Sequence, residues 1–245
     1  MSPPRTTTAT LDRRKIRLEE RDRRILDAAR EHLLRDGYHG LSMEAIAESI
    51  HFSRAVVYQH YKSKEDVLVA LAAQTGERRV ELFERASAFR GRPRERMTAI
   101  GEAVAHFALA YPSHFKTEHI IHTASVRDKC SKENQLRLAT CEAKCPQIVA
   151  GIVRDAISQG DLTLPRGVVP EQLMFGLWAM YFGGLFLMSS DIDLERKGGI
   201  AEPMNSLRRA AAALLDGWSW KPLSSEWDYD ATRKRVAQEV VRVGK

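Results

Sequence analysis

Cysteine is scarce in this chain of 245 residues, which contains only three. Such a small, odd number argues against the disulfide framework of a small secreted domain. The N-terminus lacks the apolar stretch of a secretory signal, and the longest apolar run, Leu173–Met188, is shorter than the roughly 20 residues that a membrane span needs. We therefore expect a soluble, cytoplasmic protein with no membrane partner.

The sequence also lacks the motifs of common enzyme classes. It has no nucleophile elbow, no phosphate-binding glycine loop, no HExxH zinc motif and no dinucleotide fingerprint. Long alternating runs of β-branched residues are absent too, whereas alanine, leucine, arginine and glutamate are abundant. The composition therefore predicts an all-α protein, long enough for one or two compact domains, and does not favour an enzyme.

The most informative stretch runs from Leu41 to Asp66. Ser42 is a good N-cap for a first short helix, and Ser53 is a good N-cap for a second one over Arg54–Tyr61. A tight connection separates the two. Two short helices joined in this way form a helix-turn-helix unit, whose second helix enters the major groove of DNA.

The second of these helices is unusually polar for a core element. Hydroxyl and cationic side chains suit phosphates, whereas Arg54 and Gln59 suit base edges. The simpler interpretation is a solvated helix face. We expect the DNA-contacting residues to be Ser42, Arg54, Ala55, Val56, Tyr58, Gln59, His60, Lys62 and Lys64.

A longer pattern surrounds this unit. Its elements are Ile25-Leu26-x-Ala28-Ala29, Gly37-Tyr38, Ser42, Ile46-Ala47, Ser53, Val57-Tyr58-x-His60-Tyr61 and Ser63-Lys64-Glu65-Asp66-Val67-Leu68. These elements resemble the N-terminal DNA-binding domain of TetR-type (TetR/AcrR) transcriptional regulators. The resemblance implies a three-helix DNA-binding domain followed by a helical bundle that binds an effector and forms a homodimer. It further implies a repressor that binds a palindromic double-stranded DNA operator and is released by a small molecule.

We divide the chain accordingly. Residues 1–20 are expected to form a flexible basic arm, 21–68 the DNA-binding domain, 69–220 the effector-binding and dimerisation domain, and 221–245 a tail with a short helix. Residues 1–30 contain nine Lys and Arg against five acidic residues, so the arm could follow the DNA backbone or reach a minor groove. The alternative is a merely solvated segment.

Two later segments are expected to form the dimer interface by the same resemblance, Pro170–Met188 and Pro203–Trp218. The first is apolar all round, so we expect it to be buried on most sides. The preceding helical pattern, Glu133–Ser158, contains Pro146 and should be kinked or split there.

The effector is expected to occupy a mostly apolar pocket with a few polar anchors. The same residues would also suit an ordinary core. The candidates for lining the pocket are Phe107, Tyr111, Phe115, His119, His122, Met174, Trp178 and Tyr181.

A second hypothesis for the sensor rests on the cysteines. Cys130, Cys141 and Cys145 follow two histidines within one window, and such side chains suit a metal, an iron–sulfur or haem-type centre, or a thiol switch. Their spacing matches no standard zinc motif, and cysteines at helical spacing are usually small buried hydrophobes. We therefore expect no cofactor, with the metal or redox centre as the alternative and a Cys/His enzyme as the weakest one.

Overall fold

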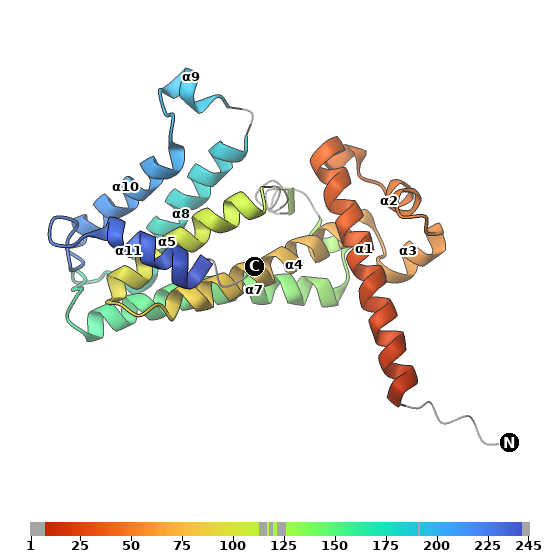
Figure 1. Ribbon diagram of the computed structural model, residues 1–245, viewed down its shortest axis with the longest axis horizontal. Coiled ribbons are helices and arrows are strands. Elements are labelled where there is room, and N and C mark those ends of the chain that lie inside the picture. The colour runs from red at the N-terminus through yellow and green to blue at the C-terminus, as the bar shows by residue number, and fades with distance from the viewer. Residues whose placement is uncertain (1–7, 113–116, 118–119, 122–125, 191, 242–245) are drawn as a thin grey trace. The chain divides into compact units, whose positions relative to one another are not determined.

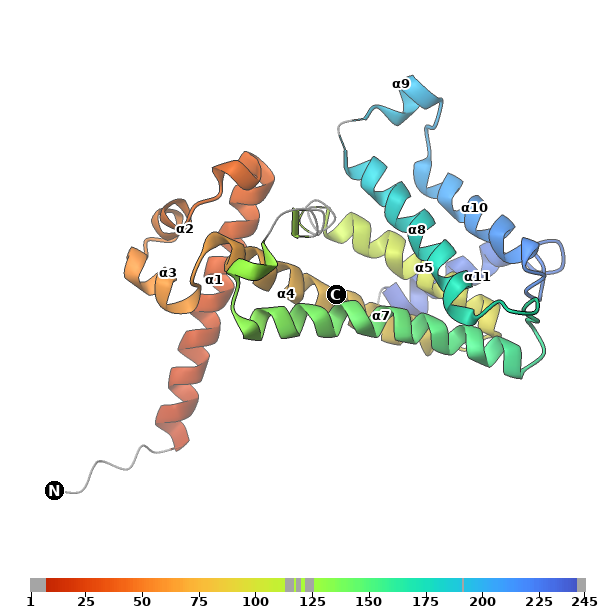
Figure 2. The same cartoon turned by 180° about the vertical axis from the view of Figure 1, so that it is seen from behind.

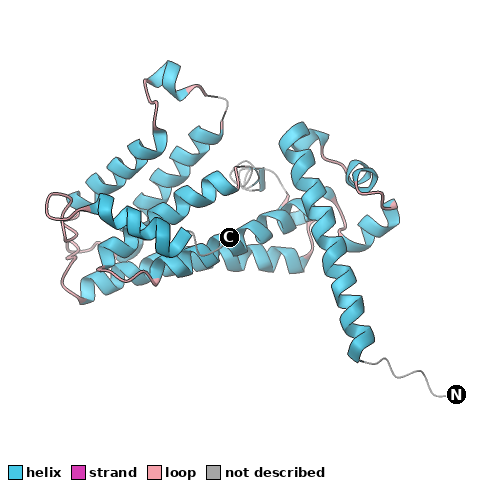
Figure 3. Cartoon of the chain, viewed as in Figure 1, coloured by secondary structure: helices cyan, strands magenta, loops and turns pink. Residues whose placement is uncertain are grey.

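The computed structural model describes residues 8–112, 117, 120–121, 126–190 and 192–241, and in these residues every regular element is a helix (Figure 3). The all-α expectation is therefore confirmed. The chain divides into two compact units. The first comprises Met1–Ala73 with Thr117–Arg137, and the second comprises Gln74–Lys116 with Leu138–Lys245. The first unit thus includes Thr117–Arg137, a segment that we had assigned to the effector domain, 69–220.

The first unit is built on a long first helix. Its elements are α1 (Thr8–Gly40), α2 (Met43–Ser49), α3 (Arg54–His60), the start of α4 (Lys64–Ser87), the 3₁₀ turn η1 (Arg127–Lys129) and the start of α7 (Lys132–Ser158). Residues 8–20 belong to α1, so the expected flexible arm is helical there. Figures 1 and 2 both show the first part of α1, in red, projecting beyond α2 and α3.

Local sequence explains where the short helices begin. The side chain of Ser42 accepts a hydrogen bond from the Ala45 amide at 3.1 Å, and that of Ser53 accepts one from the Val56 amide at 3.4 Å. These are the N-caps that the sequence predicted. Gly37 has φ of 68°, a conformation that glycine adopts at little cost, and it interrupts the regular geometry of α1 before α2.

The second unit packs the remaining helices around one apolar core. They are α5 (Pro93–Ala110), α8 (Pro170–Ser189), α9 (Leu194–Gly198), α10 (Pro203–Gly217), α11 (Tyr229–Val236) and the π-helical turn η2 (Ala237–Val241), with the later parts of α4 and α7. Phe107, Ile152, Leu173 and Trp220 lie at the centre of this core. Helix α7 continues through Pro146, so it is not split in two.

Helix α8 differs from our expectation. Within the chain it buries only Leu173, Leu177 and Leu185, whereas Phe175 and Trp178 are 60% and 61% exposed. The expectation that α8 is buried on most sides is wrong for the single chain, because α10 packs against one side and leaves the other open. By length and composition alone, α8 is also long and apolar enough to cross a membrane, so our length argument does not hold for it.

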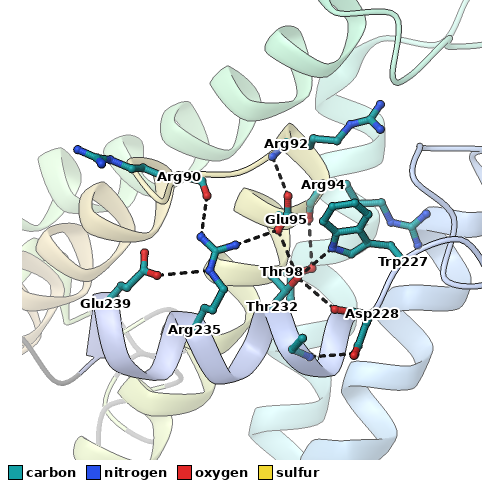
Figure 4. Close-up of polar contacts among 11 residues, drawn as sticks. Arg90, Arg92, Arg94, Glu95, Thr98, Trp227, Asp228, Thr232, Arg235 and Glu239 are labelled. Carbon is teal, nitrogen blue, oxygen red and sulfur yellow. Dashed lines mark hydrogen bonds and ion pairs between the residues drawn. The ribbon is translucent and has the colours of Figure 1, made fainter.

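The C-terminal segment is an integral part of the second unit. Glu95 of α5 accepts hydrogen bonds from the Arg92 amide at 3.0 Å and from the Thr232 hydroxyl at 3.3 Å, and Arg235 lies 3.6 Å from it (Figure 4). Trp220 is completely buried. The expected tail with a short helix therefore packs on the chain's own bundle and completes its core.

Buried Arg94 provides a second attachment of this segment. Its guanidinium donates a hydrogen bond to Asp216 at 2.6 Å and to the Ser224 hydroxyl at 3.1 Å. It also donates to the backbone carbonyl of Trp220. A buried guanidinium is stable only when its donors are satisfied, so these acceptors fix the chain that follows α10.

Candidate nucleic-acid interface

Helix α3 has one buried face and one open face. Val57 is completely buried in the core of the first unit. Arg54, Ala55, Tyr58 and Gln59 are exposed. Val56 and His60 are partly buried. The predicted contact residues of this helix therefore form a continuous outer surface. Its hydroxyl, amide and guanidinium groups are of the kinds that contact phosphates and base edges in a groove of DNA.

The contact residues outside α3 have more restricted roles. Ser42 is occupied as the cap of α2. The ammonium of Lys64 lies 4.3 Å from the centre of the Tyr38 ring and donates to the Tyr38 carbonyl at 3.4 Å, so its direction is set by α1. Lys62 is exposed. Arg54 lies 3.7 Å from Glu44, but both side chains are exposed, and such a pair contributes little and releases easily.

The C-terminal end of α3 is fixed by a buried tyrosine. Tyr61 is the C-cap residue, and its hydroxyl donates a hydrogen bond to Asp22 of α1. Burial, reinforced by this bond to Asp22, raises the pKa of Tyr61 above its ordinary value. The phenol therefore stays protonated and keeps α3 attached to α1.

A buried carboxylate holds the loop that follows α3. Asp66 is 1% exposed. It accepts hydrogen bonds from the Lys62 amide at 3.1 Å, the Ser131 amide at 3.0 Å, the Ser131 hydroxyl at 2.9 Å and the Asn134 amide side chain at 2.8 Å. Ser63 adds a hydrogen bond to the Lys129 carbonyl at 3.0 Å. The start of α7 is thereby fastened to the end of the helix-turn-helix.

These bonds also set the ionisation of Asp66. Burial by itself would raise its pKa, but the donors from Ser131, Asn134 and Lys62 favour the charged form and bring the pKa below its ordinary value. Sequence reasoning missed the role of this carboxylate, because its partners Ser131 and Asn134 are 65 and 68 positions away and no motif marks them.

The expected pocket residues are only partly brought together. The rings of Phe107 and Tyr111 have centroids 5.0 Å apart, and Met174 and Tyr181 pack against the core. Trp178 instead lies on the surface and is 61% exposed. Three further candidates, Phe115, His119 and His122, lie outside the described residues.

The second unit does contain a cavity of about 680 Å³. Its lining residues are Arg78, Glu81, Leu82, Glu84, Arg85, His106, Ala110, Tyr111 and Val241. Of these, sequence reasoning named only Tyr111, whose hydroxyl accepts a hydrogen bond from Arg78 at 2.8 Å. The lining combines apolar and charged groups, which is more polar than we had expected.

The cysteines are divided between the two units. Cys141 and Cys145 are buried members of the core of the second unit, and Cys130 is partly exposed in the first. Within the described part of the chain, no three His, Cys, Asp or Glu side chains come together as a metal site.

Helices α2 and α3, supported by α1, form a helix-turn-helix unit. Residues 25–71 match the family described as "Bacterial regulatory proteins, tetR family". The matched residues run from α1 to the start of α4, so this part of the chain is similar to the N-terminal domain of that family. It is 42% identical over 60 residues to the HTH-type transcriptional regulator UidR of Escherichia coli K12, a match that spans 24% of this chain and 31% of that relative.

Solved structures extend the likeness over most of the chain. A TetR/AcrR-family regulator from Thermobifida fusca aligns with a TM-score of 0.61 at 22% identity, covering 81% of this chain and 98% of its own. The regulator FadR from Bacillus subtilis, solved in complex with stearoyl-CoA, aligns with a TM-score of 0.58 at 18% identity, covering 79% and 97%. At these identities the likeness establishes the fold.

Proposed function

We propose that the chain is a dimeric transcriptional repressor that binds a palindromic DNA operator and leaves it when a small hydrophobic effector binds the second unit. The observation that carries the proposal is the outer surface of α3, where exposed Arg54, Tyr58 and Gln59 stand on a fully buried Val57. A core residue at that position fixes the helix, and the polar groups around it remain available to DNA. Arg54 and Gln59 would contact base edges, and Tyr58, Lys62 and Lys64 would contact phosphates.

The open face of α8 supports a homodimer. The ring of Trp178 has its centroid 6.2 Å from that of Phe175 and 6.2 Å from that of Phe182, which makes a row of aromatic rings. An exposed apolar face of this kind is typical of a protein–protein interface. A second copy of the same helix would cover it with matching chemistry, and a two-fold pair of α3 helices would read two half-sites.

The connection between sensing and DNA binding would run through two helices. Helices α4 and α7 each contribute residues to both units. Asp66 of α4 and Ser131, just before α7, meet directly behind the end of α3. An effector that favours another position of α4 or α7 would therefore alter how α3 is held, which is a population shift between binding and non-binding states.

The effector class is supported by the 680 Å³ cavity and its mixed lining. Apolar Leu82 and Val241 would contact an apolar body, and Arg78 and His106 would contact a polar group. The acyl thioester bound by FadR makes acyl thioesters sensible first members of a ligand panel.

The proposal is tested by selecting duplexes from a random library with the wild-type protein. Enrichment of a sequence with two-fold symmetry, bound by a dimer, is the expected result. A panel of hydrophobic molecules and acyl thioesters is then screened for release of the selected duplex. A monomer that enriches no sequence would overturn the proposal. Binding that persists with every ligand of the panel would remove its effector part.

A further inference from the structure

The first part of α1 carries a row of arginines on one side. Arg13, Arg17, Arg21 and Arg24, which we call the arginine stripe, are four, four and three residues apart in a continuous helix. At 3.6 residues per turn this spacing places them on one face. Within the described residues, the side chains of Arg13, Arg17 and Arg21 are exposed and take part in no ion pair. The face therefore has an excess of positive charge, with four arginines and one exposed acidic residue, Glu20, three positions after Arg17.

Arg24 shows which way this face is turned. Its guanidinium donates a hydrogen bond to the Ile50 carbonyl at 2.7 Å and lies 4.4 Å from the centre of the Phe52 ring. Both residues belong to the connection between α2 and α3, immediately before Ser53 caps α3. The stripe thus lies on the side of α1 that bears the start of the recognition helix.

The first part of α1, which carries the arginine stripe, is attached firmly to the helix-turn-helix. Asp22 accepts the hydrogen bond of Tyr61 at the C-terminal end of α3, and Arg24 holds the connection at the other end. With both ends of α3 tied to α1, the projecting turns of α1 keep a defined direction. A rigid helix loses less conformational entropy on binding than a flexible arm does.

We propose that Arg13, Arg17 and Arg21 bind the phosphates of DNA that flanks the segment read by α3, so that each protomer covers more of the duplex than its recognition helix does. This inference rests on the proposed function, because it assumes that α3 lies in the groove. Arginine is well suited to phosphate because its guanidinium stays charged and donates two parallel hydrogen bonds.

An anionic membrane surface fits the same charges less well. A helix that lies in a membrane interface needs a continuous apolar side opposite its basic one. The exposed apolar residues of this segment, Ile16 and Leu18, are two positions apart and therefore fall on different faces. The continuity of the stripe with the helix-turn-helix also favours DNA.

The experiment compares two variants that each remove two positive charges from the same helix. One is Arg13→Gln with Arg17→Gln, on the stripe. The other is Lys15→Gln with Arg23→Gln, which lie off the stripe, Lys15 being 3.9 Å from Glu19. Glutamine preserves helix propensity. Circular dichroism and urea unfolding are used to check that both variants fold like the wild-type protein. Affinity is measured by fluorescence anisotropy as a function of salt.

The probe is the duplex selected by the wild-type protein, about 40 base pairs long so that it includes flanks outside two half-sites one helical turn apart. The slope of log K against log salt becomes more negative by about 0.9 for each phosphate contact. The magnitude of this slope should therefore be smaller by about 1.8 per protomer in the stripe variant than in the wild-type protein. On a duplex trimmed to the half-sites, the wild-type slope should fall toward that of the stripe variant.

Three results would overturn the inference while leaving the proposed function intact. They are an unchanged slope in the stripe variant, equal losses in both variants, and loss of binding to phosphatidylserine vesicles with DNA binding unaffected. Failure of the wild-type protein to bind any selected duplex would instead count against the proposed function. The two failures are therefore distinguishable.

Discussion

Helices α3 and α8 both present large side chains that the chain itself does not cover, but the chemistry of the two surfaces differs. On α3 the uncovered groups are a guanidinium, a phenol and an amide around Tyr58, which is 47% exposed. On α8 they are aromatic rings around Trp178, which is 61% exposed. Polar groups are stable in contact with water, whereas the burial of exposed aromatic rings lowers the free energy of the protein.

The difference indicates two kinds of partner with different lifetimes. An apolar face is suited to a permanent contact, which here would be a second copy of the chain. A polar face on a firmly held helix is suited to a reversible contact that responds to salt and to sequence, as DNA binding does. The following variants test whether the two surfaces bind these two kinds of partner, in order of decreasing expected effect.

The largest effect is expected from Phe175→Glu combined with Trp178→Glu. Charges on the open face of α8 would have to be buried in the dimer, so the variant should be a monomer in analytical ultracentrifugation. Its operator affinity should fall by about 100-fold or more, because the two half-sites are no longer bound together. Leu109→Glu, on an even more exposed apolar side chain of α5, is the control and should remain dimeric. A dimeric double variant would show that α8 is not the interface.

Next is Asp66→Ala, which removes the acceptor of four hydrogen bonds behind α3. The buried donors left without a partner should lower the free energy of unfolding by about 3 kcal/mol in urea titrations. Asp128→Ala, on an exposed carboxylate of η1, is the control and should cost almost nothing.

The same variant predicts a pH dependence. The pKa of Asp66 in the folded protein is below its ordinary value. Its contribution to the free energy of unfolding is therefore complete at a pH above the ordinary pKa, and it is lost as the pH falls through the folded-state pKa. Wild-type stability should therefore decline more steeply in acid than that of Asp66→Ala. Parallel acid limbs for the two proteins would contradict this role.

A smaller effect is expected from Tyr58→Ala. Loss of a phosphate-binding hydroxyl should weaken DNA binding about 10-fold, or about 1.4 kcal/mol, for all sequences alike. Stability should not change, because the side chain is exposed. Gln59→Ala is the companion variant, which should instead reduce discrimination between sequences. Unchanged affinity of the Tyr58 variant in anisotropy titrations would remove it from the interface.

The smallest effect is expected from Cys141→Ala with Cys145→Ala. Both are core residues of modest size, so stability should fall by about 1 kcal/mol for each, and effector-induced release of DNA should be unchanged. Metal analysis and absorbance of the anaerobically purified wild-type protein complete the test. Loss of a metal, of colour or of oxidant-sensitive DNA binding in the variant would favour the metal or redox alternative.

Local features of the DNA-binding region were readable from sequence because short-range physics determines them. The caps Ser42 and Ser53 follow from spacing within a few residues. The structural role of Asp66 was not predicted, because it depends on hydrogen bonds from Ser131 and Asn134, which come close to it only in the tertiary structure.

The second unit was less predictable for a related reason. Composition marked α8 as apolar, but whether an apolar helix is buried depends on which neighbours cover it, and α10 covers one side. The cavity lining was missed because it joins α4 and α5 with Val241 near the end of the chain. Spacing along a sequence carries no information about such distant encounters.

The division of the chain into units has a consequence for its synthesis on the ribosome. The first unit includes Thr117–Arg137, so Asp66 stays without its Ser131 and Asn134 partners until synthesis has passed residue 134. The hydrophobic core of the second unit is completed later still, because it includes Trp220 and Val236. A nascent chain therefore contains α3 early, but the contacts of Asp66 behind α3 can be completed only after residues 74–116 of the second unit have been made.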